Sequence, residues 1–141
     1  MAQIPIKRSP CAIANGLEIL GDRWSLLIVR DLLFTNRCEF GHLLHAGEGI
    51  STNILSDRLE RLQTAGVIDK SQHPSHGKKY RYQLTEAGLK LAPTLIEFGL
   101  WCCATFDGVR MPAAVYDLAV NNREKLLAMV AARQPVIELP L

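Results

Sequence analysis

The stretch GISTNILSDRLERLQTAGVI, residues 49–68, constrains the fold of this chain more than any other. Leu55, Leu59 and Leu62 recur at i, i+4 and i+7, the spacing that places apolar side chains on one stripe of an α-helix. Ser51 is a good N-cap residue because its hydroxyl can accept a hydrogen bond from a free N–H group of the first turn. A glycine near the end of the stretch is a typical helix stop. We therefore predict one helix with a buried leucine stripe.

The opposite arc of this predicted helix is polar. At about 100° per residue, its outward positions are Asn53, Asp57, Glu60 and Arg61, with Thr52 and Ser56 at the margins. The N-terminal end of the arc holds short side chains, so another molecule can approach its backbone closely. The alternative is a solvated, salt-bridged surface, because acidic and basic side chains such as Asp57 and Arg61 would cancel in charge.

A basic β-hairpin is predicted directly after this helix. The segment VIDKSQHP is followed by the turn residues Ser75, His76 and Gly77 and then by KKYRYQLT, which alternates with the period of a β-strand. Residues 1–85 carry eleven Lys or Arg against eight Asp or Glu, a balance of +3, whereas residues 86–141 carry five against six, a balance of −1. The hairpin holds the densest part of the basic surplus, so one of its faces should be solvated and basic.

The remainder of the first 90 residues is predicted to be helical, with helices at residues 12–19, 24–33 and 38–44. Two helices joined by a turn suggest a helix-turn-helix, and the hairpin adds a wing. The expected fold class is therefore mainly α with a small β-hairpin wing, a winged helix-turn-helix with a C-terminal dimerisation helix. Its segments would be an N-terminal arm (1–10), the winged helix-turn-helix (11–90), the dimerisation helix (91–112) and a C-terminal helical extension (113–141).

This architecture suggests that the outward face of the helix after Ser51 enters a DNA groove. Short side chains permit close approach to base edges, and Asn53 can pair with adenine, while the helix N-terminus can meet a phosphate. Cations of the hairpin would hold the DNA backbone. The predicted DNA-contacting residues are Ser51, Thr52, Asn53, Ser56, Asp57, Arg61, Lys78, Lys79 and Arg81. The rival is a winged-helix protein-interaction module that does not bind DNA, and steep salt dependence would separate the two.

Composition and motifs argue against other classes of protein. With 141 residues, 48% hydrophobic and 21% charged, the chain is composed like one globular core. No stretch approaches the roughly 18 apolar residues of a membrane span, and nothing resembles a signal peptide, so we expect a cytoplasmic protein. We find no phosphate-binding glycine loop, no metal-spaced cluster and no Ser–His–acid constellation, and we therefore expect no enzyme activity, no metal and no cofactor.

The segment LAPTLIEFGLWCCATF, residues 91–106, is predicted to be a helix that needs covering on more than one side. Pro93 suits its first turn. One side can pack on the winged domain and the other on a partner helix, as a twofold homodimer would require; the alternative is burial inside one chain under the tail. The predicted dimerisation residues are Leu95, Ile96, Leu100, Trp101 and Cys103.

A further helix is expected over residues 113–133, with a polar break at Asn121 and Asn122. Its role would be to cover the core, although the wall of a ligand pocket is an alternative. The terminal segment PVIELPL is expected to be extended.

Several linked motifs resemble the HxlR-type winged-helix regulators. The run CAIANGLEILGDRWSLLIVRDLLF is similar to the family pattern C-P-x-x-x-x-L-x-x-I-G-x-K/R-W-x-x-x-I-L, and Phe40 and Leu43 fall where the family has F-x-x-L. The patterns GIS-x-x-x-L-S-x-R-L-x-x-L-x-x-x-G and Y-x-L-T-x-x-G also match, so that the resemblance covers about residues 10–106. It implies a dimeric bacterial transcription regulator that binds double-stranded DNA at a pseudo-palindromic operator. Many members are repressors, and some sense electrophiles or aldehydes.

The chain departs from the family pattern at two positions. Ala12 replaces the proline that usually follows the family cysteine, which leaves the role of Cys11 open. Asp57 stands where members often carry a neutral or basic side chain, and a carboxylate near phosphates is unfavourable unless it accepts a hydrogen bond from cytosine or leans onto Arg61.

Cys11 has two interpretations. It could be a redox or electrophile sensor if Lys7, Arg8 or a helix N-terminus favours the reactive thiolate, or it could be a small buried hydrophobe. The other three cysteines, Cys38, Cys102 and Cys103, are expected to be packing residues. The small-molecule effector, the operator sequence and the sign of regulation are not specified by these patterns.

Overall fold

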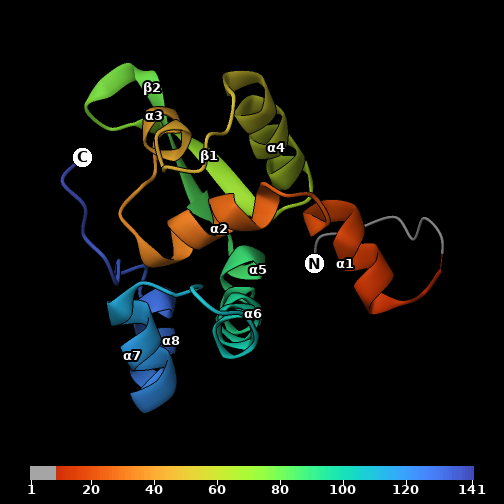
Figure 1. Cartoon of the computed structure of the whole chain (residues 1–141). Coiled ribbons are helices and arrows are strands. Elements are labelled where there is room, and N and C mark those ends of the chain that lie inside the picture. Colours follow the sequence, from red (N-terminus) through yellow and green to blue (C-terminus); the bar gives the residue numbers. More distant parts are fainter. Residues whose placement is uncertain (1–8) are drawn as a thin grey trace.

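The structure, a computed structural model, describes residues 9–141; it is mainly helical, with one two-stranded antiparallel hairpin (Figure 1). In chain order the elements are α1 (Ala12–Leu20), α2 (Ser25–Phe34), α3 (Phe40–Leu44), α4 (Thr52–Thr64), β1 (Ile68–His73), β2 (His76–Leu84), α5 (Glu86–Leu89), α6 (Ala92–Thr105), α7 (Ala113–Asn121) and α8 (Arg123–Ala131). The predicted fold class, mainly α with a hairpin wing, is confirmed. Residues 1–8, most of the predicted arm, lie outside the described residues.

Helix α4 forms where the leucine spacing predicts it. The Ser51 hydroxyl accepts a hydrogen bond from the N–H of Ile54 at 3.3 Å and so caps the helix. The three leucines of the stripe are at most 2% exposed. Gly66 follows the helix with a φ of +73°, a conformation that costs glycine little and other residues more. The predicted serine cap and glycine stop are therefore both confirmed.

Strands β1 and β2 pair antiparallel, with Ile68 opposite Leu84. The turn between them consists of Pro74 and Ser75, and the fixed φ of proline suits such a position. The predicted turn at residues 75–77 is thus placed too late, because its last two residues already belong to β2. The turn lies earlier because Pro74 suits a turn position, whereas His76 and Gly77 adopt the extended backbone of β2.

Helix α2 runs through the centre of the molecule and supplies much of the core (Figure 1). Val29 is fully buried on it, and Phe34 is nearly so. The leucine stripe of α4 and the inward residues of β2, Tyr82 and Leu84, belong to the same apolar cluster. The winged domain is therefore assembled around α2, which leaves the opposite faces of α4 and the hairpin exposed.

The single helix predicted over residues 113–133 is wrong, because the chain forms two helices, α7 and α8, that lie side by side (Figure 1). Asn122 separates them with a non-helical backbone of φ −153° and ψ 65°. Its side-chain oxygen accepts a hydrogen bond from the N–H of Lys125 at 3.2 Å and so caps α8. The polar break at Asn121 and Asn122 therefore ends α7 and lets α8 run back beside it.

The C-terminal segment lies along the end of α2. The N–H groups of Val136 and Ile137 donate to the carbonyl of Phe34 at 3.0 and 2.9 Å. The side chain of Asn36 both donates to the carbonyl and accepts from the N–H of Leu139, each at 3.0 Å. Residues more than one hundred positions apart in the sequence therefore share one structural unit.

Candidate nucleic-acid interface

The N-terminal half of α4 is exposed and carries short polar side chains. Thr52, Asn53 and Ser56 are all exposed, whereas Leu55 between them is fully buried. The buried stripe fixes the rotation of the helix, so these three side chains share the outward surface. An exposed helix N-terminus with small side chains can be approached closely by base edges and phosphates.

The two charged residues predicted on this face have different partners from those expected. The Asp57 carboxylate accepts a hydrogen bond from Arg58, its neighbour in sequence. Arg61 instead extends toward α1, where it donates to the carbonyl of Glu18 at 3.4 Å. Asp57 therefore does not pair with Arg61, and both side chains remain exposed on α4.

Asp22, which sequence reasoning missed, joins α4 to the start of α2. Its carboxylate accepts hydrogen bonds from the N–H groups of Trp24 and Ser25 at 2.8 and 3.0 Å, and from the Ser25 hydroxyl at 2.5 Å. Arg58 Nε donates to the same carboxylate at 2.9 Å. Burial alone would raise the pKa of Asp22, but the hydrogen bonds from Ser25, Trp24 and Arg58 outweigh it and lower the pKa to about 2.

Part of this arrangement has a sequence signal. Aspartate side chains commonly accept hydrogen bonds from backbone N–H groups a few residues further on, so the bonds from Asp22 to the start of α2 could have been predicted. Its partner Arg58 lies 36 residues away, and only the packing of α4 against the rest of the domain brings the two together.

The hairpin presents its cations on the surface. Lys78, Lys79 and Arg81 are exposed, and Lys79 Nζ lies 3.6 Å from a carboxylate oxygen of Glu39. Glu39 also lies 3.3 Å from His73 Nε2. This acidic residue before α3 therefore offsets part of the hairpin charge, whereas Lys78 and Arg81 form no ion pair with a carboxylate among the described residues.

Helix α4 and the hairpin tip lie at one end of the molecule, and α6, α7 and α8 lie at the other (Figure 1). The elements that carry the predicted DNA-contacting residues, α4 with its cap and the hairpin, are thus brought to the same part of the molecule. The predicted dimerisation helix is remote from them.

Helix α6 begins at Ala92 with a proline in its first turn, as predicted. Its burial corrects part of the predicted dimerisation face: Ile96 is fully buried and Leu95 is 9% exposed, both within this chain's own core. The fold covers them with α2 and α8, which the helical pattern alone could not reveal. Leu100 and Cys103 are partly buried, and Trp101 is 55% exposed.

An exposed aromatic cluster on α6 and its C-cap residue was not identified as a unit from the sequence. The rings of Phe98 and Trp101 are stacked at 6.1 Å, and Phe106 meets Trp101 edge-on at 5.5 Å. We call these three side chains the aromatic patch. All three are about half exposed. The i, i+3 spacing of Phe98 and Trp101 is the sequence signal that could have identified it.

Cys11 is exposed and occupies the N-cap position of α1. The predicted location before a helix is therefore correct, whereas burial as a small hydrophobe is not observed. Lys7 and Arg8, the cations expected beside it, lie outside the described residues. Cys38, Cys102 and Cys103 are partly buried free thiols.

Within residues 9–141, no three or more His, Cys, Asp or Glu side chains are grouped so that they could hold a metal ion. Over the same residues, no helix combines the length and apolar character needed to cross a bilayer.

The exposed α4 N-terminus and the basic hairpin on a three-helix core define a winged helix-turn-helix protein. Residues 19–108 match the HxlR-like helix-turn-helix family, and the chain belongs to that family. Similar proteins include two uncharacterised HTH-type transcriptional regulators. One, from Synechocystis, is 36% identical over 86 residues, or 61% of this chain and 63% of that protein. The other, from Mycobacterium bovis, is 36% identical over 90 residues, or 64% of this chain and 56% of that protein.

The chain therefore covers less than two thirds of the length of these two relatives. Solved structures extend the likeness to the fold. PA1607, described as a candidate transcription factor, has a TM-score of 0.67 and 32% identity and covers 75% of this chain and 72% of its own. A candidate MarR-family regulator from Porphyromonas gingivalis has a TM-score of 0.63 and 29% identity, with coverages of 72% and 98%.

Proposed function

We propose that this chain is a sequence-specific DNA-binding transcription regulator, in which α4 enters the major groove and the hairpin contacts the DNA backbone. The observation that carries the proposal is the presence, at one end of the molecule, of exposed short polar side chains on α4 and exposed cations on the hairpin (Figure 1). The names of the relatives, HTH-type transcriptional regulators, support the same function. The protein would act in the cytoplasm, as a regulator and not as an enzyme.

The proposal includes a homodimer that acts as a repressor. Exposed apolar surface of this kind is typical of protein–protein contacts, and the aromatic patch lies at the end of the molecule remote from α4. A twofold axis through α6 would leave both copies of α4 free. Their operator would then be pseudo-palindromic, with half-sites about one helical turn of DNA, or a multiple of it, apart.

A second proposal concerns Cys11 as a sensor of electrophiles or oxidants. Its thiol is exposed, and its carbonyl accepts bonds from both nitrogens of Asn15, so it forms part of the first turn of α1. Helix α1 in turn contacts α4 through Glu18 and Arg61. Modification of the Cys11 thiol would disturb the first turn of α1 and, through α1, its contact with α4. An electrophile should release the wild-type protein from DNA, whereas Cys11→Ser should bind but not respond; an unchanged response in Cys11→Ser would contradict the assignment.

The decisive experiment is recovery and footprinting of genomic DNA bound by the purified full chain, repeated over a range of salt concentrations. We expect protected sites with twofold symmetry and an affinity that falls steeply with salt, because bound cations release counterions from DNA. Failure to enrich any DNA, or an affinity indifferent to salt, would favour a protein-interaction module. Recovery of non-symmetric sites alone would contradict the dimer.

A further inference from the structure

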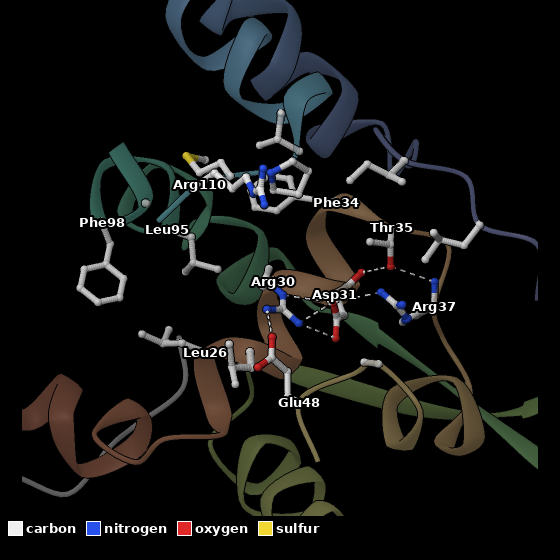
Figure 2. A pocket seen from close by; sticks show the side chains of 18 of the residues that line it. Leu26, Arg30, Asp31, Phe34, Thr35, Arg37, Glu48, Leu95, Phe98 and Arg110 are labelled. Atoms are coloured by element: carbon white, nitrogen blue, oxygen red, sulfur yellow. Dashed lines mark hydrogen bonds and ion pairs between the residues drawn. The ribbon is translucent and has the colours of Figure 1, made fainter. Parts of the chain in front are cut away.

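A cavity of about 760 Å³ lies between α2, α6, the chain that enters α7 and the C-terminal segment (Figure 2). Its walls are mostly apolar and include Leu26, Phe34, Leu95, Met111 and Ile137. This volume falls within the range of small-molecule sites, about 300–1,000 Å³. The cavity is separate from the exposed face of α4 and is not needed for contact with DNA.

Charged side chains from α2 and the following segments meet at one wall of the cavity (Figure 2). Arg30 donates to Glu48 at 2.8 Å and to Asp31 at 3.1 Å. Arg37 lies 3.4 Å from the same Asp31 carboxylate, whose side chain is only 6% exposed. These two arginines and two carboxylates balance in charge. Burial raises the pKa of Asp31, and the positive charges of Arg30 and Arg37 oppose that shift.

Arg110 is the third arginine of the cavity, on the opposite side from this cluster (Figure 2). It is exposed, and it forms no hydrogen bond or ion pair with any residue of the described range. The charged lining therefore has one surplus positive charge. An arginine fork beside an apolar cavity matches the geometry of a carboxylate attached to an apolar body.

We propose that this cavity binds a small amphipathic organic carboxylate, whose anionic group pairs with Arg110 and whose aromatic or aliphatic body contacts the apolar walls. The pairing supplies orientation and charge selectivity, and the walls supply most of the buried apolar area. Neutral and cationic analogues of the same shape lack the ion pair and bind more weakly.

The bound molecule acts as an effector, an extension that rests on the proposed DNA-binding function. Helix α2 lines the cavity along its length, from Leu26 to Phe34. Its N-terminal end is bonded to Asp22, which also holds Arg58 of α4. A ligand that changes the packing of α2 against α6 therefore biases the position of α4. Coupling of this kind changes affinity typically by about 5–150-fold.

The chain contains a suitable reporter for binding. Met111 lines the cavity, whereas Met129 lies on α8 outside it. In full-length protein labelled with ¹³C-methyl methionine, titration with 2-naphthoate should shift the Met111 methyl resonance to saturation and leave that of Met129 in place. The neutral 2-naphthamide and the cationic 2-(aminomethyl)naphthalene should each bind about tenfold more weakly, because charge-assisted hydrogen bonds are the stronger ones.

Arg110→Gln should weaken the binding of 2-naphthoate about tenfold and leave the affinity for 2-naphthamide unchanged. Lys125→Gln is the matched control, because it removes one exposed positive charge on α8 outside the cavity. This variant should bind both compounds with the affinity of wild type. The site is overturned if neither 2-naphthoate nor octanoate moves Met111, if the amide binds as tightly as the acid, or if Arg110→Gln binds 2-naphthoate like wild type.

The effector role is tested on operator DNA recovered by footprinting. Saturating 2-naphthoate should change the operator affinity of wild-type protein at least about fivefold, and Arg110→Gln should need about tenfold more 2-naphthoate for the same change. A shifted Met111 resonance with unchanged operator affinity overturns the effector role. Absence of operator binding by the ligand-free protein overturns the proposed DNA-binding function instead.

Discussion

Arg58 and Arg61 carry the same charge on the same helix, but their partners differ. Arg58 is held by two carboxylates, Asp22 and Asp57, and these hydrogen bonds and charges raise its pKa despite the cost of desolvation. Among the described residues, the Arg61 side chain has one hydrogen bond, to the carbonyl of Glu18 at 3.4 Å. The first arginine therefore stabilises the domain, and the second is available to a phosphate.

At the residue scale we predict that Asn53→Ala and Lys78→Ala will have different effects on DNA binding. Asn53→Ala removes a side chain able to pair with adenine, so specific affinity should fall by about 1–3 kcal/mol and base choice should relax. Lys78→Ala removes an exposed cation, so affinity for all sequences should fall alike and the salt slope should decrease by about 1. Quantitative binding to operator and random DNA across salt concentrations measures both.

Lys125→Ala is the control for charge, because this exposed lysine lies on α8, at the end of the molecule remote from α4. Its binding should equal that of wild type. Equal, sequence-independent losses from Asn53→Ala and Lys78→Ala would mean that α4 does not contact bases.

At the scale of elements, the bond network of Asp22 ties α2 to α4 and makes stability depend on pH. The folded-state pKa of Asp22, about 2, lies below its ordinary value of 3.8. Its stabilising contribution is therefore fully present above about pH 4 and is lost as the pH falls toward 2.

We expect Asp22→Ala to lower the free energy of unfolding at pH 7 by about 0.5–2 kcal/mol, the usual cost of a lost helix cap. The difference from wild type should shrink between pH 4 and pH 2. Denaturant unfolding at several pH values measures it. Asp107→Ala, which removes an exposed carboxylate outside this network, should have little effect; a difference that persists unchanged at pH 2 would contradict the role of the ionised carboxylate.

Elements whose stability comes from local pattern were the ones that the sequence could predict. The leucine stripe and Ser51 cap of α4 and the alternation of the hairpin each act within one element. Asn122 also acts locally, but an asparagine side chain can either remain within a helix or cap the next one, and the sequence pattern does not decide between them. The burial of Ile96, the Asp22–Arg58 bond and the docking of Leu139 beside Asn36 depend on contacts between distant segments, which periodicity does not encode.

At the scale of the whole molecule, the aromatic patch predicts how the chain associates. We expect Trp101→Ser to weaken the homodimer by removing the central ring of the patch, so that sedimentation equilibrium shows a shift toward monomer. Binding to a full palindromic operator should fall more than binding to a half-site, because joint engagement of two half-sites is lost.

Tyr116→Ser is the matched control, since this tyrosine on α7 is 45% exposed but does not belong to the patch. In sedimentation equilibrium, the Tyr116→Ser variant should show the same distribution between monomer and dimer as wild type. A wild-type chain that sediments as a monomer, or a Trp101→Ser variant that dimerises as strongly as wild type, would show that the patch has another role.

The division of α4 into a buried leucine side and an exposed polar side affects how such a protein can diversify. Thr52, Asn53 and Ser56 face outward and contribute nothing to the core, so substitutions there can accumulate with little loss of stability. Arg58, two residues after Ser56, lacks this freedom because it is bonded to Asp22. Duplicated copies of the gene could therefore acquire new target sequences at these three codons while inheriting the same scaffold, and a combinatorial library restricted to them would sample altered specificity among variants that still fold.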